Sequence, residues 1–391
     1  MKPFPGNKYR VLWVTSAFPY EESLVAGIFV KEHAQAARLL DDITILHLLE
    51  RQRTIRSLWD IKVSSHEVHG GIALIRVRAR QNALPFSTFP VHIFSAFRGL
   101  RECQRVSGPF DLVHAHSYRA GVPAALIAKK LRVPLVITEH NSIFLRKALH
   151  GFEYHKAAFA YRSAACILPV SKALQRAIQD YGFSTLAQVI GNTFDPEVFF
   201  PGPANRASEK LHLITVTNLI PLKGVSTLLQ ALKNVSSRLP EWELQIVGDG
   251  PEKSSLIQQA SELGISSQVS FSGMLTKPQI AEALRGSHLY ILSSSHETFS
   301  VATLEALACG VPVLATACGG PEDFITPEVG NLIPPNSQTE MENGLVQVVL
   351  RIDQFDRNKI AQIIRSRYSY PAIGGQIHQA YRSVLPDPVK T

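Results

Sequence analysis

Two glutamates with seven residues between them, Glu297 and Glu305, are the side chains whose spacing most strongly suggests chemistry. They lie in the segment SSSHETFSVATLEALACGVPVLATACGGPEDFI, which runs from Ser293 to Ile325. An apolar run precedes the first glutamate, a helix-forming run (LEALA) contains the second, and another apolar run (VPVLA) follows. This pattern predicts a strand, a loop, a helix and a strand. Glu297 then falls in the loop, and Glu305 about one and a half turns into the helix.

This position favours a ligand that carries both hydroxyl groups and negative charge. Ligands of open parallel sheets bind at the carboxyl ends of the strands, where such loops and helix starts converge. The unpaired N–H groups of a helix beginning near Ser300 favour an anion, and carboxylates accept hydrogen bonds from hydroxyls. A sugar nucleotide offers both features. The alternative is that both glutamates are solvated surface residues, as most glutamates are.

The segment resembles the Glu-x7-Glu signature of the retaining glycosyltransferases of family 4, which have the GT-B fold. The match extends through Gly310, Pro312 and the turn at Gly319 and Gly320. The resemblance implies an α/β protein of two Rossmann-like, doubly wound parallel-sheet domains facing a cleft. It also implies a retaining hexosyltransferase that uses a UDP-sugar or a GDP-sugar, and no cofactor is expected.

The same resemblance assigns roles to the residues of the segment. Glu305 is expected to accept hydrogen bonds from the ribose hydroxyls of the donor, and Glu297 to hold hydroxyls of the transferred sugar. The loop and helix start between them contribute further donor contacts, from Thr298, Phe299, Ser300 and Val301.

A lysine in the run TNLIPLKGVSTLLQAL, Lys223, follows a predicted strand and precedes a predicted helix. A cation at this point can contact a phosphate beside the helix N-terminus. The family pattern is Gly-Arg-Leu, three residues, Lys-Gly, and this chain has Thr217 and Asn218 in place of Gly-Arg. The resemblance therefore implies that Lys223 stabilises the leaving diphosphate, while Asn218 donates only a hydrogen bond where the family has a second cation.

Four glycines are expected to lie close to the donor. Gly248 and Gly250 belong to the run VGDGPE, which resembles the family's turn beneath the nucleotide, and their lack of a side chain also suits a tight turn. Gly273 ends the run VSFSG, which resembles the strand end near the nucleobase. Gly27 fits the family's glycine loop before the first helix of the N-terminal domain.

Two histidines of the first half follow predicted strands. His140 comes directly after the run PLVITE, and the resemblance implies that it contacts the transferred sugar. His116, in DLVHAHSYRAG, and Asn141 are assigned to the acceptor side. A buried structural histidine is the alternative at each position.

The length of 391 residues predicts two domains. We expect an N-terminal acceptor-binding domain over residues 1–198 and a C-terminal nucleotide-sugar domain over residues 199–372. The linker is the segment DPEVFFPGPANRAS, rich in proline and polar residues. The resemblance implies that a last helix, about 373–391, packs back on the first domain.

Short apolar runs alternate with amphipathic runs, as in parallel α/β units. Strands are expected near residues 11–15, 43–48, 72–77, 112–114, 135–138, 165–169, 188–190, 211–216, 243–247, 269–271, 289–292, 311–315 and 330–333. Helices are expected over 30–40, 122–131, 172–181, 225–238, 252–263, 278–285 and 301–308.

The composition narrows the protein classes. Four scattered cysteines, Cys103, Cys166, Cys309 and Cys318, indicate buried thiols rather than disulfides or a zinc site. No Asp-x-Asp motif occurs, so a metal-dependent transfer is not expected. The mean hydropathy of +0.04 and the absence of an apolar run of roughly 18–20 residues argue against a membrane span and favour a cytoplasmic protein.

The charge is concentrated in the first half. Residues 1–200 carry 25 Lys and Arg against 15 Asp and Glu. Such a surface suits an anionic membrane, so we expect peripheral association with the inner membrane face and a glycan or lipid-linked acceptor of envelope or exopolysaccharide synthesis. No nucleic-acid motif is present, and a generally basic solvated surface is the alternative. A sugar-nucleotide epimerase, a phosphorylase or a catalytically weak donor-binding subunit remain competing functions.

Overall fold

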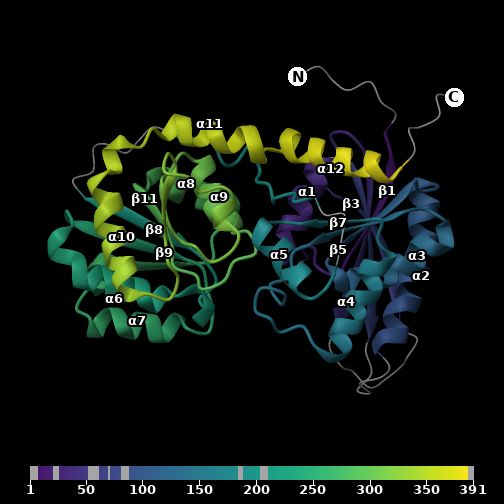
Figure 1. Ribbon diagram of the computed structural model, residues 1–391, viewed down its shortest axis with the longest axis horizontal. Coiled ribbons are helices and arrows are strands. Elements are labelled where there is room, and N and C mark those ends of the chain that lie inside the picture. The colour runs from purple at the N-terminus through teal and green to yellow at the C-terminus, as the bar shows by residue number, and fades with distance from the viewer. Residues whose placement is uncertain are drawn as a thin grey trace. The chain divides into compact units, whose positions relative to one another are not determined.

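The computed structural model describes residues 8–20, 26–51, 61–68, 71–80, 88–183, 188–202 and 210–385 (Figure 1). The chain forms two compact units. Unit 1 comprises Met1–Val170, Leu174–Asn192 and Tyr370–Thr391, and unit 2 comprises Ser171–Ala173 and Thr193–Ser369. The chain thus leaves unit 1 near residue 192 and returns to it at residue 370.

Unit 1 contains a seven-stranded sheet in the order β3-β4-β2-β1-β5-β6-β7. All neighbours pair in parallel except β3 and β4, which are antiparallel. The strands are β1 (Arg10–Thr15), β2 (Asp42–Arg51), β3 (Ile61–Val68), β4 (Ile72–Arg80), β5 (Leu112–His116), β6 (Leu135–Glu139) and β7 (Cys166–Pro169). The order reverses between β1 and β5, which places a topological switch point there.

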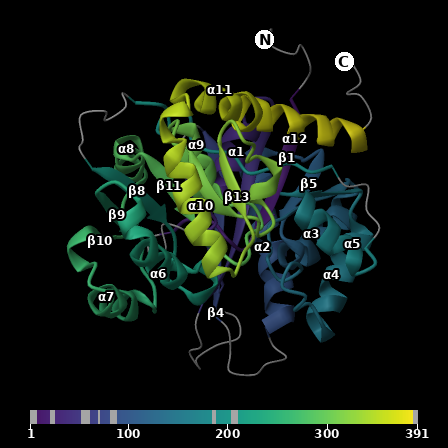
Figure 2. The ribbon, with the colours of Figure 1, turned by 60° about the vertical axis from the view of Figure 1, so that its left-hand side comes forward.

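Helices cover both faces of this sheet. They are α1 (Ile28–Ala37), α2 (Thr88–Ser107), α3 (Tyr118–Leu131), α4 (Gly151–Ser163), α5 (Lys172–Asp180) and α12 (Tyr370–Val384). Figure 2 shows α3 and α4 side by side, and Gly121 of α3 provides the room for this approach, since a Cβ there would lie 2.9 Å from the Ala160 side chain. On the other face α1 packs against α12, and Trp13 of β1 donates a hydrogen bond to the Tyr381 hydroxyl of α12 at 3.0 Å.

Unit 2 contains a six-stranded parallel sheet in the order β10-β9-β8-β11-β12-β13. The strands are β8 (Leu211–Val216), β9 (Trp242–Val247), β10 (Val269–Gly273), β11 (Leu289–Leu292), β12 (Val313–Thr316) and β13 (Gly330–Ile333). The helices are α6 (Val225–Val235), α7 (Lys253–Glu262), α8 (Lys277–Gly286), α9 (Val301–Ala308), α10 (Gln338–Leu350) and α11 (Arg357–Tyr368). The order reverses between β8 and β11.

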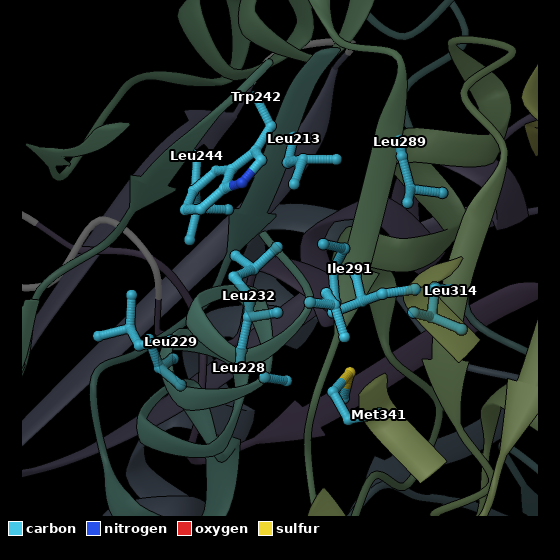
Figure 3. Packing of buried hydrophobic residues seen from close by; sticks show 14 of the residues in the cluster. Leu213, Leu228, Leu229, Leu232, Trp242, Leu244, Leu289, Ile291, Leu314 and Met341 are labelled. Carbon is cyan, nitrogen blue, oxygen red and sulfur yellow. The ribbon is translucent and has the colours of Figure 1, made fainter. Parts of the chain in front are cut away.

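A buried apolar cluster joins this sheet to the helices on one face (Figure 3). Alternate residues of neighbouring strands, Leu213, Leu289 and Ile291, point into it, as the two-residue period of a strand requires. They meet Leu228 of α6 and Met341 of α10. This packing holds β8 and β11 side by side, and the loops that leave their carboxyl ends are placed accordingly.

The expected α/β class of two parallel-sheet, Rossmann-like domains is confirmed, with several local differences. Strand β3 and helices α2, α4, α10 and α11 were not expected from the sequence. The strand expected at 188–190 is wrong, because these residues are irregular and Ile190 donates one backbone hydrogen bond to Pro169. The edge strand β3 has a largely polar sequence, IKVSSHEV, which differs from the continuous apolar runs of the buried strands.

Some expectations fall partly outside the described residues. Residues 203–209 of the expected linker and residues 386–391 of the expected last helix are among them. Within the described ranges, no helix is both long enough and apolar enough to cross a bilayer. All four cysteines are described, and each is buried and outside any disulfide.

Candidate functional site

The switch point of unit 2 brings together two loops that are far apart in the sequence. One leaves β8 and carries Lys223 at the end of the short 3-10 helix Pro221–Lys223. The other leaves β11 and carries Glu297. Gly224, with φ of 63°, lets the first loop approach the second, because a Cβ there would lie 2.3 Å from the Ser293 carbonyl oxygen. Ser293 in turn donates a hydrogen bond to the Lys223 carbonyl at 2.7 Å.

Lys223 and Glu297 form an ion pair at this junction. The Lys223 Nζ lies 2.5 Å from Glu297 Oε1, and the side chains are 20% and 12% exposed. Ser294 Oγ also donates to Oε1, at 2.8 Å. Oε2 of Glu297 accepts no hydrogen bond from any residue that the structure describes, and two of the three ammonium donors remain for other acceptors. The pair can therefore present a carboxylate oxygen and a cation to one ligand.

Glu305 lies on α9 and is 7% exposed. Its Oε1 is 4.0 Å from Nζ of Lys277, the first residue of α8. Lys277 is held there by the start of α8, where Thr276 and Gln279 form a capping box. A second cation thus stands near the second glutamate, at a position that the sequence analysis did not single out.

The start of α9 is shaped by an unusual residue. Ser300 is the N-cap with φ of 74°, and its hydroxyl is 2.8 Å from the Thr303 hydroxyl. Helix α9 leaves unpaired N–H groups in its first turn, where Val301 is half-buried. The Phe299 ring is buried against Phe324 and Tyr368, with ring centroids 5.1 and 5.7 Å away. Only the backbone of Phe299 is thus available to a ligand, while the Thr298 side chain is half-buried.

Gly248 and Gly250 allow the turn after β9 to touch the loop after β8. Their φ angles are 137° and 158°, and a Cβ would lie 1.8 Å from the Thr217 carbonyl oxygen and 2.4 Å from that of Leu219. These contacts explain both glycines by packing. Asn218, between the two contacted residues, is exposed. At Gly273, where φ is 67°, the nearest atom is Lys253 Nζ, 3.8 Å from the ideal Cβ position.

In unit 1, Glu139 organises the loop that follows β6. Its side chain is fully buried, and Oε1 accepts hydrogen bonds from the backbone N–H groups of His140 and Asn141 at 2.9 and 2.8 Å. Oε2 accepts from the Tyr118 backbone N–H and from the Tyr161 hydroxyl, both at 2.8 Å. Burial raises the pKa of this carboxyl. A charged residue at the end of an apolar strand is the signal that could have identified Glu139.

His116 and His140 end neighbouring strands and contact each other. His116 Nδ1 lies 3.1 Å from His140 Nε2, and the rings are stacked. His33 of α1 joins them, so that one ring nitrogen from each histidine lies within 4.8 Å of the others. Burial lowers the pKa of His33 to about 4 and those of His116 and His140 well below the ordinary value. His33 was missed because it lies within an ordinary helical pattern.

The two remaining predicted residues of unit 1 serve local structure. Asn141 Oδ1 accepts a hydrogen bond from the Ile143 N–H at 2.9 Å, which closes a side-chain turn. Gly27 is the N-cap of α1 with φ of 63°, and its carbonyl accepts from Val30 and Lys31. A Cβ at Gly27 would lie 2.1 Å from the Ala17 carbonyl oxygen. Neither observation tests a contact with donor or acceptor.

Comparisons with known proteins agree with this architecture. The model of glycosyl transferases group 1 matches residues 200–365, and that of glycosyltransferase family 4 matches residues 54–198. The putative teichuronic acid biosynthesis glycosyltransferase TuaC of Bacillus subtilis is 26% identical over 362 residues, which cover 86% of this chain and 88% of that protein. The N-acetyl-alpha-D-glucosaminyl L-malate synthase of Bacillus anthracis is 26% identical over 293 residues, covering 71% and 76%.

Solved structures share the fold. Sucrose-phosphate synthase from Thermosynechococcus elongatus superposes with a TM-score of 0.74 at 18% identity, covering 96% of this chain and 99% of that one. HepE of Anabaena, in complex with UDP and glucose, gives a TM-score of 0.73 at 20% identity, covering 96% and 100%. The two Rossmann-like parallel-sheet units and these neighbours define the GT-B fold, and the two family models, which together match most of residues 54–365, identify a glycosyltransferase. The chain belongs to glycosyltransferase family 4.

Proposed function

We propose that this protein is a retaining hexosyltransferase that moves a sugar from a UDP-sugar or a GDP-sugar to a glycan or lipid-linked acceptor. The observation that carries the proposal is the ion pair of Lys223 and Glu297 at the switch point of unit 2. The loop with Glu297 leads directly into α9, the helix that carries Glu305. The similarity to TuaC, a putative teichuronic acid biosynthesis glycosyltransferase matched over most of both chains, supports a role in envelope or exopolysaccharide synthesis.

In this proposal each ligand-facing group of unit 2 contacts a different part of the donor. Glu305 accepts hydrogen bonds from the ribose hydroxyls, and Glu297 Oε2 accepts from hydroxyls of the transferred sugar. Lys223 and the N–H groups at the start of α9 stabilise the charge that grows on the leaving diphosphate. Asn218 and the turn at Gly248 and Gly250 border the same ligand.

The assignments in unit 1 rest on the family resemblance. His140 orients the transferred sugar, while His116 and Asn141 lie on the acceptor side. Gly27 supplies backbone N–H groups to phosphate or acceptor. The transfer itself uses no metal, because the diphosphate is neutralised by Lys223 and by backbone groups.

A thermal-shift panel with UDP, GDP, ADP, CDP and their common sugar conjugates tests donor binding. A ligand at 100 times its Kd should stabilise the protein by about 2.7 kcal/mol. We expect a shift with one nucleotide class and its loss in Glu305→Ala, because the ribose contact disappears. Glu262→Ala, at an exposed position of α7, is the matched control. No shift with any nucleotide would contradict the donor site.

Turnover separates the role of Glu297 from that of Glu305. We expect Glu297→Ala to lower kcat more than it weakens nucleotide binding, because its contact is with the transferred sugar. The anomeric configuration of the product, compared with that of the donor by NMR, tests retention. Inverted product would overturn the retaining mechanism, and unchanged kinetics in both variants would overturn the site.

The acceptor side is proposed to work at an anionic membrane surface on the inner face of the membrane. The excess of basic residues in residues 1–200 supports this proposal. Not every arginine there is on the surface, since the Arg76 guanidinium donates to His47 Nδ1 and to the Pro19 carbonyl. Arg53 and Arg56 lie outside the described residues. Equal binding to neutral and anionic vesicles would contradict a membrane role.

Asn218, in place of the family's arginine, favours one alternative: a donor-binding subunit with weak catalysis. A sugar-nucleotide epimerase or a phosphorylase is the other. Release of nucleotide diphosphate measured with and without acceptor distinguishes them. Acceptor-dependent release supports transfer, release that requires no glycan acceptor indicates the epimerase or the phosphorylase, and binding without release indicates the subunit. We expect Asn218→Arg to strengthen donor binding.

A further inference from the structure

Three buried histidines of unit 1 gather from separate elements. His33 comes from the middle of α1, His116 is the last residue of β5, and His140 directly follows β6. One ring nitrogen of each lies within 4.8 Å of the others. Because β5 and β6 are neighbours in the parallel sheet, their carboxyl ends place His116 and His140 side by side.

The hydrogen bonds of these rings leave three nitrogens without partners. His116 Nδ1 and His140 Nε2 face each other at 3.1 Å, and His33 Nε2 lies 3.1 Å from the Gly191 carbonyl oxygen. His33 Nδ1, His116 Nε2 and His140 Nδ1 are buried and have no hydrogen-bond partner among the described residues. Buried polar atoms are rarely left in this state without a reason. His33 Nδ1 is the one of the three that could take part in a site between the rings, whereas His116 Nε2 and His140 Nδ1 are the outer nitrogens of the facing pair.

Neighbouring side chains hold the rings in place. The Trp13 ring lies against His116 with centroids 4.3 Å apart, and the Phe29 ring lies against His140 at 4.4 Å. A fourth histidine, His114, stacks on His116, but its two nitrogens are engaged by the Tyr381 and Thr138 hydroxyls at 2.7 Å each. His114 therefore supports the cluster without being available as part of it.

We propose that His33, His116 and His140 form a binding site for a divalent transition metal ion of the zinc type, which links α1 to the ends of β5 and β6. Three neutral imidazoles with a fourth position open suit Zn²⁺ and its neighbours, whereas Mg²⁺ and Ca²⁺ require oxygen ligands. Two carboxylates adjoin the ligands in sequence: both oxygens of Glu139, before His140, are already used by four donors, and Glu32, before His33, accepts a hydrogen bond from the Tyr370 hydroxyl. The fourth position is thus left to water or another small ligand.

Metal binding requires the three nitrogens, which now lie within 4.8 Å of one another, to approach the spacing of a zinc site. Nitrogens bound to one tetrahedral zinc ion at about 2.0–2.1 Å lie about 3.4 Å apart, close to the 3.1 Å between His116 and His140. The carbonyl of Gly191 accepts from Nε2 of His33 and leaves Nδ1 to the metal, which is the usual outer hydrogen bond of a ligating histidine. The imidazole that now donates between His116 and His140 must move its proton to its outer nitrogen. Burial keeps all three imidazoles neutral near pH 7, as metal ligands must be.

The site goes beyond the proposed transfer reaction, which uses no metal. The site has one functional consequence, which rests on the proposed role of His140 at the transferred sugar. A metal ion bound to His140 removes this side chain from the transferred sugar, so zinc should inhibit the enzyme.

Direct metal binding tests the site without an activity assay. The full-length protein, free of any histidine tag and stripped with a chelator, is titrated with Zn²⁺ against a fluorescent zinc chelator and, separately, with Co²⁺. We expect one Zn²⁺ per chain and visible Co²⁺ absorption bands of the intensity typical of four-coordinate nitrogen sites. No binding of either ion at micromolar concentration would overturn the proposal.

Single substitutions test whether these histidines are the ligands of the metal ion. His33→Gln and His116→Gln should each weaken Zn²⁺ binding by at least about 100-fold, more than the 10–100-fold loss of an outer-sphere partner. His155→Gln, at an exposed position of α4, is the matched control and should bind as the parent protein does. Thermal melts of each variant without metal show whether it is folded. Unchanged binding in folded His33→Gln, or equal loss in the control, would overturn the assignment.

Activity provides a separate readout. Zn²⁺ should inhibit the parent enzyme, and His33→Gln should be resistant to zinc at the same concentration. If zinc binds with the expected stoichiometry but no nucleotide-sugar is turned over, the metal site stands and the proposed function fails. If nucleotide-sugar is turned over and zinc does not bind, the proposed function stands and the metal site fails.

Discussion

At the scale of single residues, buried charged side chains fix the conformation of the loops that follow the strands. Glu139 lies at the end of β6 and receives four hydrogen bonds, from three backbone N–H groups and the Tyr161 hydroxyl. These bonds fix the backbone of His140 and Asn141. Lys223 and Glu297 do the same for two loops of unit 2, and there the charges also remain accessible to a ligand.

Glu139→Gln should destabilise unit 1. The amide group of glutamine cannot accept the hydrogen bonds that one carboxylate oxygen now accepts, so two buried donors lose their partner. We expect a loss of about 1–3 kcal/mol in the free energy of unfolding, measured by urea denaturation. Asp180→Asn, at an exposed position of α5, serves as the control. Equal stability of both variants would show that the four bonds do not hold the loop.

At the scale of elements, helices are positioned by a few polar contacts and by close backbone approach. Glu153 in the first turn of α4 bonds to Lys156, to Arg119 and to the Tyr118 hydroxyl of α3. Gly27 begins α1 in the left-handed region. The contacts of Glu153 and the conformation of Gly27 each lead to a testable prediction, for α4 and for α1.

The contacts of Glu153 predict a pH dependence. Burial raises the pKa of this carboxyl, but the hydrogen bonds of Lys156 and Tyr118 and the charge of Arg119 outweigh it and lower the pKa to about 2. A carboxyl with a lowered folded-state pKa stabilises the fold above its unfolded-state pKa, and this stabilisation is lost as the pH falls from about 4.5 toward 2. Because the side chain is partly exposed, we expect a contribution of about 1 kcal/mol. Acid denaturation of the parent and of Glu153→Gln measures it, and parallel curves would contradict the prediction.

Gly27→Ala should be strongly destabilising. The new methyl group would meet the Ala17 backbone in a conformation with positive φ, where neither side can move cheaply. We expect a loss of more than about 1 kcal/mol, read from the thermal unfolding midpoint. Gly375→Ala in α12 is the matched comparison, because no atom lies within 4 Å of its Cβ position. There, alanine should be neutral or stabilise by up to about 1 kcal/mol.

At the scale of the whole molecule, the chain completes unit 1 only with its last helix. Ile373, Ile377 and Tyr381 of α12 are buried, and the Tyr381 hydroxyl bonds to Trp13 and His114. Unit 2, in contrast, is continuous from Thr193 to Ser369 apart from three residues before it. The stability of unit 1 therefore depends on residues at the far end of the chain.

Ending the chain after Ser369 should unfold unit 1 and leave unit 2 folded. Removal of α12 exposes the buried face of α1 and leaves the hydrogen-bonding groups of Trp13 and His114 without the hydroxyl that they share. Limited proteolysis with mass spectrometry measures this. We expect rapid cleavage within residues 8–183 and survival of a fragment near 193–369. Survival of both units would show that α12 is dispensable.

The sequence by itself determined the class of fold and most of its elements. The alternation of apolar runs and amphipathic helices is a local property, so strands such as β8 and β11 and helices such as α6 and α9 could be predicted. Glu297 and Glu305 could be paired because both lie in one continuous strand–loop–helix segment. Edge strand β3 and helix α4 were not predicted, because β3 is largely polar and α4 buries adjacent alanines such as Ala157 and Ala158.

Only the tertiary structure decided which distant side chains meet. Lys223 and Glu297 are 74 residues apart, and they contact each other because β8 and β11 are neighbours at the switch point of the sheet. His33 joins His116 and His140 because α1 packs beside the carboxyl ends of β5 and β6. The order of strands in a parallel sheet results from the packing of all its helices at once. No local periodicity encodes that order, so contacts that depend on it cannot be read from the pattern of a single segment.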